Sequence, residues 1–253
     1  MSSNSSVVGQ DHLFLVDKEW KEVLPTVLKL KKIGGRKYFN ETENISEAFS
    51  LSDTDLRCID EGTAGGVHMA GSGILLNINR AEEICKKANV SGVYSHAECG
   101  AARIYAKREN LDEEESDEFG IEWAKTLAEK LKVPYKGHIE IEKMVRPSGL
   151  HTAVAAYYDG TGKFDNSKIA GLPKGFVINR KYLDSDYGKT ELKTAIEIAF
   201  GSHGFSEKFN QETPFSVIVL GSEKETLDTE AAEAREVAAS FGERVLIHSV
   251  LLK

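Results

Sequence analysis

Cysteine is scarce in this chain of 253 residues: it occurs only at Cys58, Cys85 and Cys99. An odd number of cysteines cannot all pair within one chain, and these spacings do not suggest a disulfide framework. We therefore treat each cysteine as a free thiol. Such a thiol is either a small buried hydrophobe or a ligand for a soft metal ion.

The chain also lacks long apolar runs and an excess of positive charge. No stretch approaches the ~20 apolar residues that cross a bilayer. The net charge is −8, whereas general nucleic-acid binding needs a basic surface that displaces counterions. Residues 1–6 have neither the charged start nor the apolar core of a signal peptide. We therefore expect a cytoplasmic protein that binds neither membranes nor nucleic acid.

Strand-like and helix-like patterns alternate along most of the sequence. The expected strands are 56–60, 91–94, 138–145, 152–158, 176–178, 215–220 and 244–252. Helical spacing of apolar residues marks 80–88, 100–108, 121–131, 191–200 and 227–241, and an N-terminal helix that begins at Asp17 and ends at Gly34. This alternation predicts an α/β fold with a mostly parallel central sheet and helices on both faces.

The expected organisation has three parts. Residues 1–52 form an N-terminal helical arm, 53–172 an α/β core that binds zinc, and 173–253 a C-terminal α/β extension packed on the same sheet. The sequence shows no internal repeat. The tetrapeptide Asp159-Gly-Thr-Gly162 predicts a β-hairpin turn, and Ser222-Glu-Lys-Glu225 resembles a capping box at the start of a helix.

Two short stretches carry metal-ligand chemistry: Cys58-Ile-Asp60 and His96-Ala-Glu-Cys99-Gly100. Cys58 and His96 each end an expected strand, and ligands in open α/β sheets gather at the carboxyl ends of strands. Two thiolates and one imidazole with an open fourth position form the layout of a catalytic zinc site. We expect Cys58, His96 and Cys99 to hold Zn²⁺, with Asp60 beside a zinc-bound water. Cys85 instead fits a buried position on an apolar helix face.

In this order, the two stretches resemble the zinc site of the β-class carbonic anhydrases, which carry Cys-x-Asp-x-Arg and later His-x-x-Cys-Gly. The stretch His68-Met-Ala-Gly-Ser resembles the Arg-x-Ala-Gly-Asn loop of that family, and 153–164 is similar to its late strand and hairpin. The resemblance covers roughly residues 53–165. It implies a carbonic-anhydrase-like core and a homodimer. It also implies hydration of CO₂ to bicarbonate through a zinc-bound hydroxide, with Asp60 as the catalytic residue.

The sequence departs from that family at one position that matters for activity. Gly62 stands where the family has an arginine that pairs with the aspartate and keeps it off the metal. Arg57, Arg103 and Arg146 are candidates to replace it from elsewhere in the chain. Without such a partner, Asp60 is free to ligate the zinc ion and block the open position.

This departure leaves alternatives to a CO₂ hydratase. The chain could be a divergent metal-binding α/β protein without that activity, or a hydrolase of a related small molecule such as CS₂ or COS. Two thiolates also suit a softer ion such as cadmium. A nucleotide-binding α/β protein with incidental cysteines is a further hypothesis. His68, in the glycine-rich loop, either lines the pocket as a proton carrier or has a surface or packing role.

Overall fold

The computed structural model describes the backbone of residues 5–252 and the side chains of residues 11–252. Its strands form two four-stranded sheets in which all neighbours are parallel. The first sheet, in the order β2-β1-β3-β4, contains β1 (Leu56–Arg57), β2 (Val67–His68), β3 (Val93–His96) and β4 (Tyr135–Ile139). The second, in the order β6-β5-β7-β8, contains β5 (Ala155–Asp159), β6 (Gly175–Ile178), β7 (Phe215–Gly221) and β8 (Val245–Leu251).

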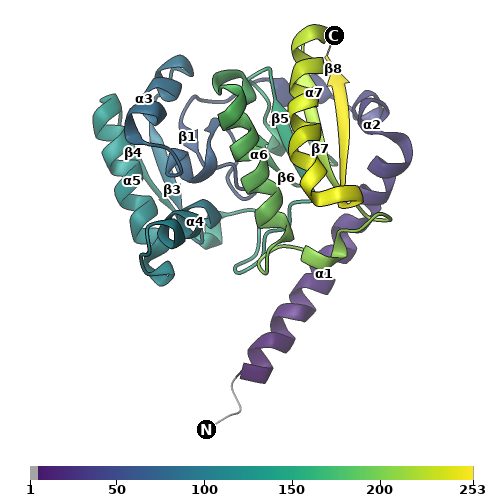
Figure 1. Ribbon diagram of the computed structural model, residues 1–253, viewed down its shortest axis with the longest axis horizontal. Coiled ribbons are helices and arrows are strands. Elements are labelled where there is room, and N and C mark those ends of the chain that lie inside the picture. The colour runs from purple at the N-terminus through teal and green to yellow at the C-terminus, as the bar shows by residue number, and fades with distance from the viewer. Residues whose placement is uncertain (1–4, 253) are drawn as a thin grey trace.

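Helices accompany both sheets (Figure 1). The α-helices are α1 (Ser5–Ile33), α2 (Gly35–Glu41), α3 (Ile78–Lys87), α4 (Gly100–Arg108), α5 (Ser116–Leu131), α6 (Ser185–Phe200) and α7 (Lys224–Ala238). The 3₁₀-helices are η1 (Ile45–Phe49), η2 (Ala70–Gly73), η3 (Glu113–Glu115), η4 (Ile141–Lys143), η5 (Asn166–Lys168), η6 (Arg180–Tyr182), η7 (Ser206–Lys208) and η8 (Ala239–Arg244). The predicted α/β class with parallel strands is confirmed, but the strands form two sheets instead of one central sheet.

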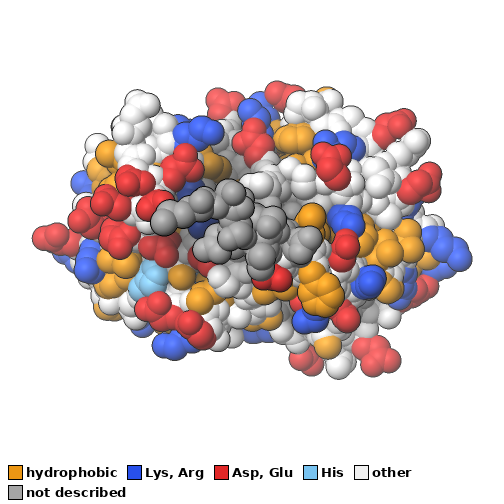
Figure 2. Space-filling model, turned by 90° about the horizontal axis from the view of Figure 1, so that it is seen from below, with side chains coloured by type: hydrophobic (Ala, Val, Ile, Leu, Met, Phe, Trp, Pro, Cys, Tyr) orange, Lys and Arg blue, Asp and Glu red, His pale blue; other side chains and the backbone are white. Residues whose placement is uncertain are grey.

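Figure 1 places α3, α4 and α5 beside the first sheet and α6 and α7 beside the second. The N-terminal part of the long helix α1 extends away from the body, whereas its C-terminal part packs against it. Seen from below, acidic side chains gather toward the side of α4 and α5 (Figure 2), in keeping with the net charge of −8. Within residues 5–252, no helix has the length and apolar character that a membrane crossing requires.

The two sheets share one strand order. In each, the second strand pairs on one side of the first, and the third and fourth strands follow on its other side. The direction of winding therefore reverses between β1 and β3 and again between β5 and β7. Ligand sites in open α/β sheets lie outside the carboxyl ends of the strands at such reversal points. The repetition is one of topology, because the sequence itself shows no repeat.

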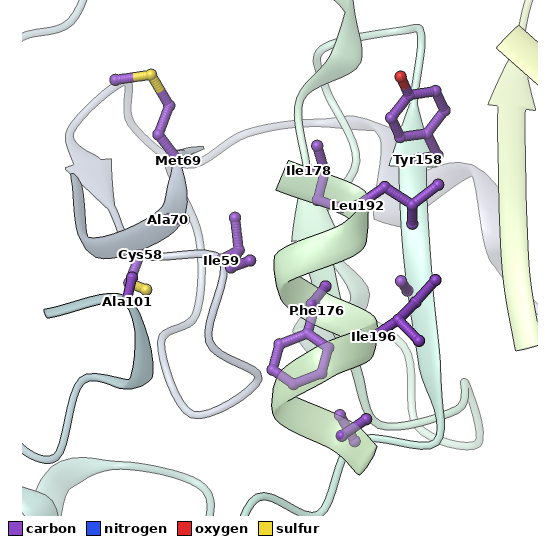
Figure 3. Packing of buried hydrophobic residues seen from close by; sticks show 14 of the residues in the cluster. Cys58, Ile59, Met69, Ala70, Ala101, Tyr158, Phe176, Ile178, Leu192 and Ile196 are labelled. Carbon is purple, nitrogen blue, oxygen red and sulfur yellow. The ribbon is translucent and has the colours of Figure 1, made fainter. Parts of the chain in front are cut away.

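The two sheets meet through a shared core. Ile59, directly after Cys58, is 1% exposed, and its carbonyl accepts a hydrogen bond of 3.1 Å from the amide of Val177 in β6. Figure 3 shows Ile59 between the loop that carries Cys58 and the side chain of Phe176. The expected boundary at residue 172 falls between β5 and β6, which pair within one sheet.

Three local predictions are wrong. The segment Asp159–Gly162 does not form a hairpin, because β5 pairs in parallel with β6. Residues 138–145 are not one strand, since β4 ends at Ile139 and η4 follows. The capping box at Ser222 is not formed, because α7 begins after Glu223 with no side-chain cap.

The N-terminal helix is also longer than expected. Asp17 does not cap it, because α1 runs from Ser5 to Ile33 with Pro25 inside it. Its end before Gly34 agrees with the prediction. Apolar side chains of α1 such as Trp20, Val23 and Val27 are buried in the core, and this packing offsets the backbone hydrogen bond that proline cannot make.

Candidate metal centre

The three predicted zinc ligands come together at the carboxyl edge of the first sheet. Cys58 follows β1, His96 ends β3, and Cys99 lies just before α4. One ligand atom from each lies within 4.8 Å of the others, and all three side chains are buried. The site sits where the sheet reverses its direction of winding, so the topology accounts for the convergence of residues 41 positions apart.

The two sulfur atoms have the spacing of a dithiolate metal site. Cys58 Sγ and Cys99 Sγ are 3.9 Å apart, far longer than a disulfide bond of about 2.05 Å. Two Zn–S bonds of ~2.3 Å at a tetrahedral angle require about 3.8 Å. The amide of Gly71 donates a hydrogen bond of 3.1 Å to Cys58 Sγ. A side chain at Gly71 would lie 2.6 Å from Ile74, so this close approach of the backbone needs glycine.

His96 presents one ring nitrogen without a partner. Its Nδ1 lies 2.9 Å from the carbonyl oxygen of Ala97. A carbonyl only accepts, so this contact places a proton on Nδ1, and the neutral ring then carries its lone pair on Nε2. Nε2 is buried and has no hydrogen-bond partner among the described residues. An oriented imidazole with a free Nε2 lone pair is the arrangement of a metal-ligating histidine.

The Cys58 thiol needs a cation to ionise. Burial raises the pKa of the Cys58 thiol well above its ordinary value, and the neighbouring Cys99 raises it further. A bound divalent cation reverses this effect, because the metal stabilises the thiolate directly. The donor set of two sulfurs and one nitrogen, with a free lone pair on His96, therefore fits Zn²⁺.

Asp60 lies beside these ligands and is held by Arg146. Arg146 Nε is 3.0 Å from Asp60 Oδ1 and 3.2 Å from Oδ2, and both side chains are buried. The amide of Gly62 donates a further hydrogen bond of 2.7 Å to Oδ1. Asp60 Oδ2 is 3.9 Å from His96 Nδ1. Burial disfavours the charged carboxylate, but His151, His96 and Arg146 outweigh it and lower the pKa of Asp60.

Arg146 is the arginine that pairs with Asp60, since position 62 is a glycine and cannot do so. Its guanidinium also donates from Nη1 to Glu98 Oε2 at 3.2 Å and from Nη2 to the Glu98 carbonyl at 3.2 Å. Arg57, another candidate, instead pairs with Asp53 at 2.7 Å. Glu98, which lies between His96 and Cys99 in the sequence, therefore anchors the arginine. The contact depends on long-range folding that the sequence pattern does not encode.

Gly62 makes room for this arginine. A Cβ atom at Gly62 would lie 2.6 Å from Met144 Cε, 3.0 Å from Asp60 Oδ1 and 3.1 Å from Arg146 Cγ. Any larger residue would therefore push aside the end of the Met144 side chain and crowd both Asp60 and Arg146. Glycine at this position thus leaves room for the contact between Asp60 and Arg146.

Sequence reasoning missed His151. His151 Nδ1 lies 3.6 Å from Asp60 Oδ2 and 3.2 Å from Glu61 Oε2. Glu61 Oε1 also accepts a hydrogen bond of 2.5 Å from the amide of Thr152. Asp60, Glu61 and His151 form a second cluster of ligand-type atoms next to the first. Nothing local marks His151, because its partners lie about 90 residues away.

His68 takes the interior alternative of its two predicted roles. It is 2% exposed, and its Nδ1 lies 2.6 Å from the carbonyl oxygen of Cys58. Its amide donates to Asn179 Oδ1 at 2.6 Å. Burial lowers the pKa of His68. The residue therefore fixes the backbone that carries Cys58.

Comparisons of the chain with protein-family models, with curated proteins and with solved structures found no match.

Proposed function

We propose that this chain is a zinc-dependent, carbonic-anhydrase-like lyase that hydrates CO₂ to bicarbonate. The observation that carries the proposal is the position of Asp60. Its carboxylate lies 3.9 Å from His96, yet Arg146 and the Gly62 amide hold it. It groups with Glu61 and His151, apart from the three-residue ligand cluster.

Cys58, His96 and Cys99 would hold the zinc ion and leave a fourth position open. When bound, zinc lowers the pKa of a coordinated water toward ~7, which supplies a nucleophile at neutral pH. Burial of all three ligands excludes bulk water and strengthens the electrostatic interactions inside the site. A small, uncharged triatomic molecule needs little space and no charged recognition group, so it suits a site of this kind.

Asp60 would accept a hydrogen bond from the attacking water or hydroxide and orient it. Its lowered pKa keeps it ionised and therefore able only to accept. Arg146 would act as a positioning residue, because its Nε and the Gly62 amide both bind Oδ1. Oδ2 accepts a longer hydrogen bond of 3.2 Å from Arg146 and lies 3.6 Å from His151 Nδ1. That oxygen, which also lies nearer to His96, is the one available to the substrate side of the site.

The proposal includes a cytoplasmic homodimer, as the family resemblance implies. A reducing compartment keeps Cys58 and Cys99 as thiols that can bind metal. Leu13 and Phe14 on α1 are 65% and 74% exposed, and a second copy of the chain would cover such side chains. Light scattering of the purified protein tests this element separately: a single species of monomer mass would contradict it.

Stopped-flow measurement of CO₂ hydration by the zinc-loaded chain tests the proposed activity. We expect a rate well above the buffer reaction at neutral pH, and loss of that rate in Asp60→Asn with the zinc content unchanged. A chain that binds zinc but does not hydrate CO₂ at any pH would favour metal binding without this activity. Hydrolysis of CS₂ or COS by the same preparation would instead redirect the proposal to those substrates.

A further inference from the structure

A cleft lies at the reversal point of the second sheet, and the proposed function does not use it. Its volume is about 960 Å³, and its lining includes Gly160 and Thr161 after β5 and Gly221 and Ser222 at the end of β7. This is the place that the metal centre occupies between β1 and β3 in the first sheet. The volume falls within the ~300–1,000 Å³ that is usual for small-molecule sites.

The loop after β5 is fixed before any ligand arrives. The buried carboxylate of Asp159 accepts hydrogen bonds from the amide of Thr161 at 2.8 Å and from Asn179 Nδ2 at 3.1 Å. Asp60 makes the same turn in the first sheet, where its Oδ1 accepts from the amide two residues later. Both sheets therefore present a rigid loop at the same point, one beside a metal centre and the other beside an open cleft.

The cleft carries more positive than negative charge. Three cationic side chains line it, Arg36, Lys163 and Lys181, against one carboxylate, Glu223. Among residues 11–252, none of the three cations has a carboxylate within 4.0 Å. By contrast, the neighbouring Arg180 is paired with Glu233 at 2.8 Å. The cations that face the cleft are thus available to an anionic ligand.

The start of α7 adds hydrogen-bond donors to the same wall. This helix of 15 residues begins at Lys224, and no side chain caps it. Its first amides lack partners within the helix, and a helix N-terminus favours phosphate groups. The hydroxyl-bearing residues Ser222 and Thr226 flank this point and also line the cleft. This side of the cleft therefore offers both positively charged side chains and backbone amides that can donate hydrogen bonds.

Another part of the lining is apolar. Phe49, Ile45 and Leu252 contribute to it, with the nearly buried Phe39 and Val250 behind them. A ligand that uses both parts of the lining combines an anionic group with a flat apolar body. We propose that the cleft binds an organic phosphate of the mononucleotide class. Its phosphate contacts Lys163, Lys181 and the start of α7, and its body packs against the phenylalanines.

Calorimetric titration of the full chain with adenosine 5′-monophosphate tests this proposal, with adenosine and inorganic phosphate as separate titrants. We expect one saturable site for the monophosphate and binding at least about tenfold weaker for either fragment, because each fragment engages one wall only. The absence of saturable monophosphate binding would overturn the proposal. Equal affinity for adenosine would overturn the assignment of the phosphate wall.

Two variants locate the binding. Lys163→Gln combined with Lys181→Gln removes two exposed charges, and Thr226→Trp fills the cleft from the exposed face of α7. Each should weaken monophosphate binding by at least about tenfold. The control is Lys193→Gln, on α6 outside the cleft and with a side chain 58% exposed, which should bind like the parent. Equal affinity in all variants would contradict this location. Zinc content should be unchanged throughout, so this test is independent of the proposed hydratase activity.

Discussion

Arg146 and Asp60 are 86 residues apart in the sequence and form a buried ion pair, with Nε 3.0 Å from Oδ1. The arginine reaches Asp60 through space that Gly62 leaves free. Removing one partner of such a pair leaves an uncompensated buried charge, which typically costs about 3–5 kcal/mol. The pair therefore connects the stability of the core with the orientation of the residue that the proposed reaction needs.

The first prediction concerns Arg146. Arg146→Gln should lower the free energy of unfolding by about 3 kcal/mol or more and release Asp60, while zinc stays bound. Asp60 can then turn toward the metal, so hydration activity should recover only above pH ~8, where hydroxide competes for the open position. Urea unfolding and a pH–rate profile measure the two effects. An unchanged pH profile would contradict the positioning role.

A double-mutant cycle separates the pair from general damage to the core. In the Asp60→Asn background, Arg146→Gln should cost less stability than in the parent, with a coupling energy above about 1 kcal/mol. If the two substitutions lower stability additively, the contact between Arg146 Nε and the Asp60 carboxylate contributes little to stability.

The second prediction concerns Gly62. Gly62→Ala should reduce activity by at least about tenfold and destabilise the fold by about 1–3 kcal/mol, because its methyl group overlaps Met144 Cε and crowds Arg146 Cγ. The matched control is Gly120→Ala in α5, where the new Cβ meets its nearest neighbour at 3.8 Å. Alanine there should be neutral or stabilising by up to about 1 kcal/mol. Equal effects of the two substitutions would contradict the steric argument.

The third prediction uses the three cysteines. Cys58→Ser should lose the bound zinc, which we expect at about one ion per chain. Cys85→Ser should retain it, because Cys85 lies in α3 outside the ligand cluster although it is equally buried. Elemental analysis of the purified variants measures this directly. Retention of the metal in Cys58→Ser, or its loss in Cys85→Ser, would contradict the assignment of the ligands.

Much of the candidate site follows from the sequence, because its proposed ligands lie in two short stretches at the ends of strands. The candidate pair His96 and Cys99 is local, and Cys58 joins it once β1 and β3 are neighbours. The choice of Arg146 over Arg57 and the contacts of His151 depend on contacts across 86 and 90 residues. Local sequence patterns do not predict contacts between residues so far apart in the chain.

The errors in the fold have a similar cause. Turn-forming residues at Asp159–Gly162 are equally compatible with a loop, and only the pairing of β5 with β6 decides between a loop and a hairpin. Strand-like patterns also do not specify which strands pair, so they could not distinguish two sheets from one. Alternation of strands and helices was sufficient for the α/β class, because a parallel sheet needs crossovers.

The fourth prediction concerns Glu191 in α6, whose carboxylate accepts a hydrogen bond of 2.7 Å from the amide of Ala70. Burial raises its pKa to about 8, and the Ala70 contact lowers it only in part. In the unfolded chain the pKa is about 4.3. At pH values between these two pKa values, the folded state therefore binds more protons at Glu191 than the unfolded state does. This contribution to stability is complete below pH ~4.3 and decreases as the pH rises to about 8.

Glu191→Gln should remove this pH dependence, because glutamine can accept the same hydrogen bond without ionising. The variant should be the more stable protein at pH 8, and its advantage should shrink toward pH 4. The control, Glu197→Gln, changes an exposed carboxylate of the same helix and should keep the slope of the parent. Urea unfolding across this pH range measures all three proteins. Parallel curves for parent and Glu191→Gln would contradict the prediction.

The most direct test of the central claim is stopped-flow CO₂ hydration by the zinc-loaded chain, compared with Asp60→Asn carrying the same zinc content. The proposal predicts that the parent accelerates hydration at neutral pH. It also predicts that Asp60→Asn loses at least about tenfold of that rate, as expected for a group that orients the attacking oxygen. A parent that binds one zinc ion per chain and gives only the buffer rate at every pH would contradict the claim.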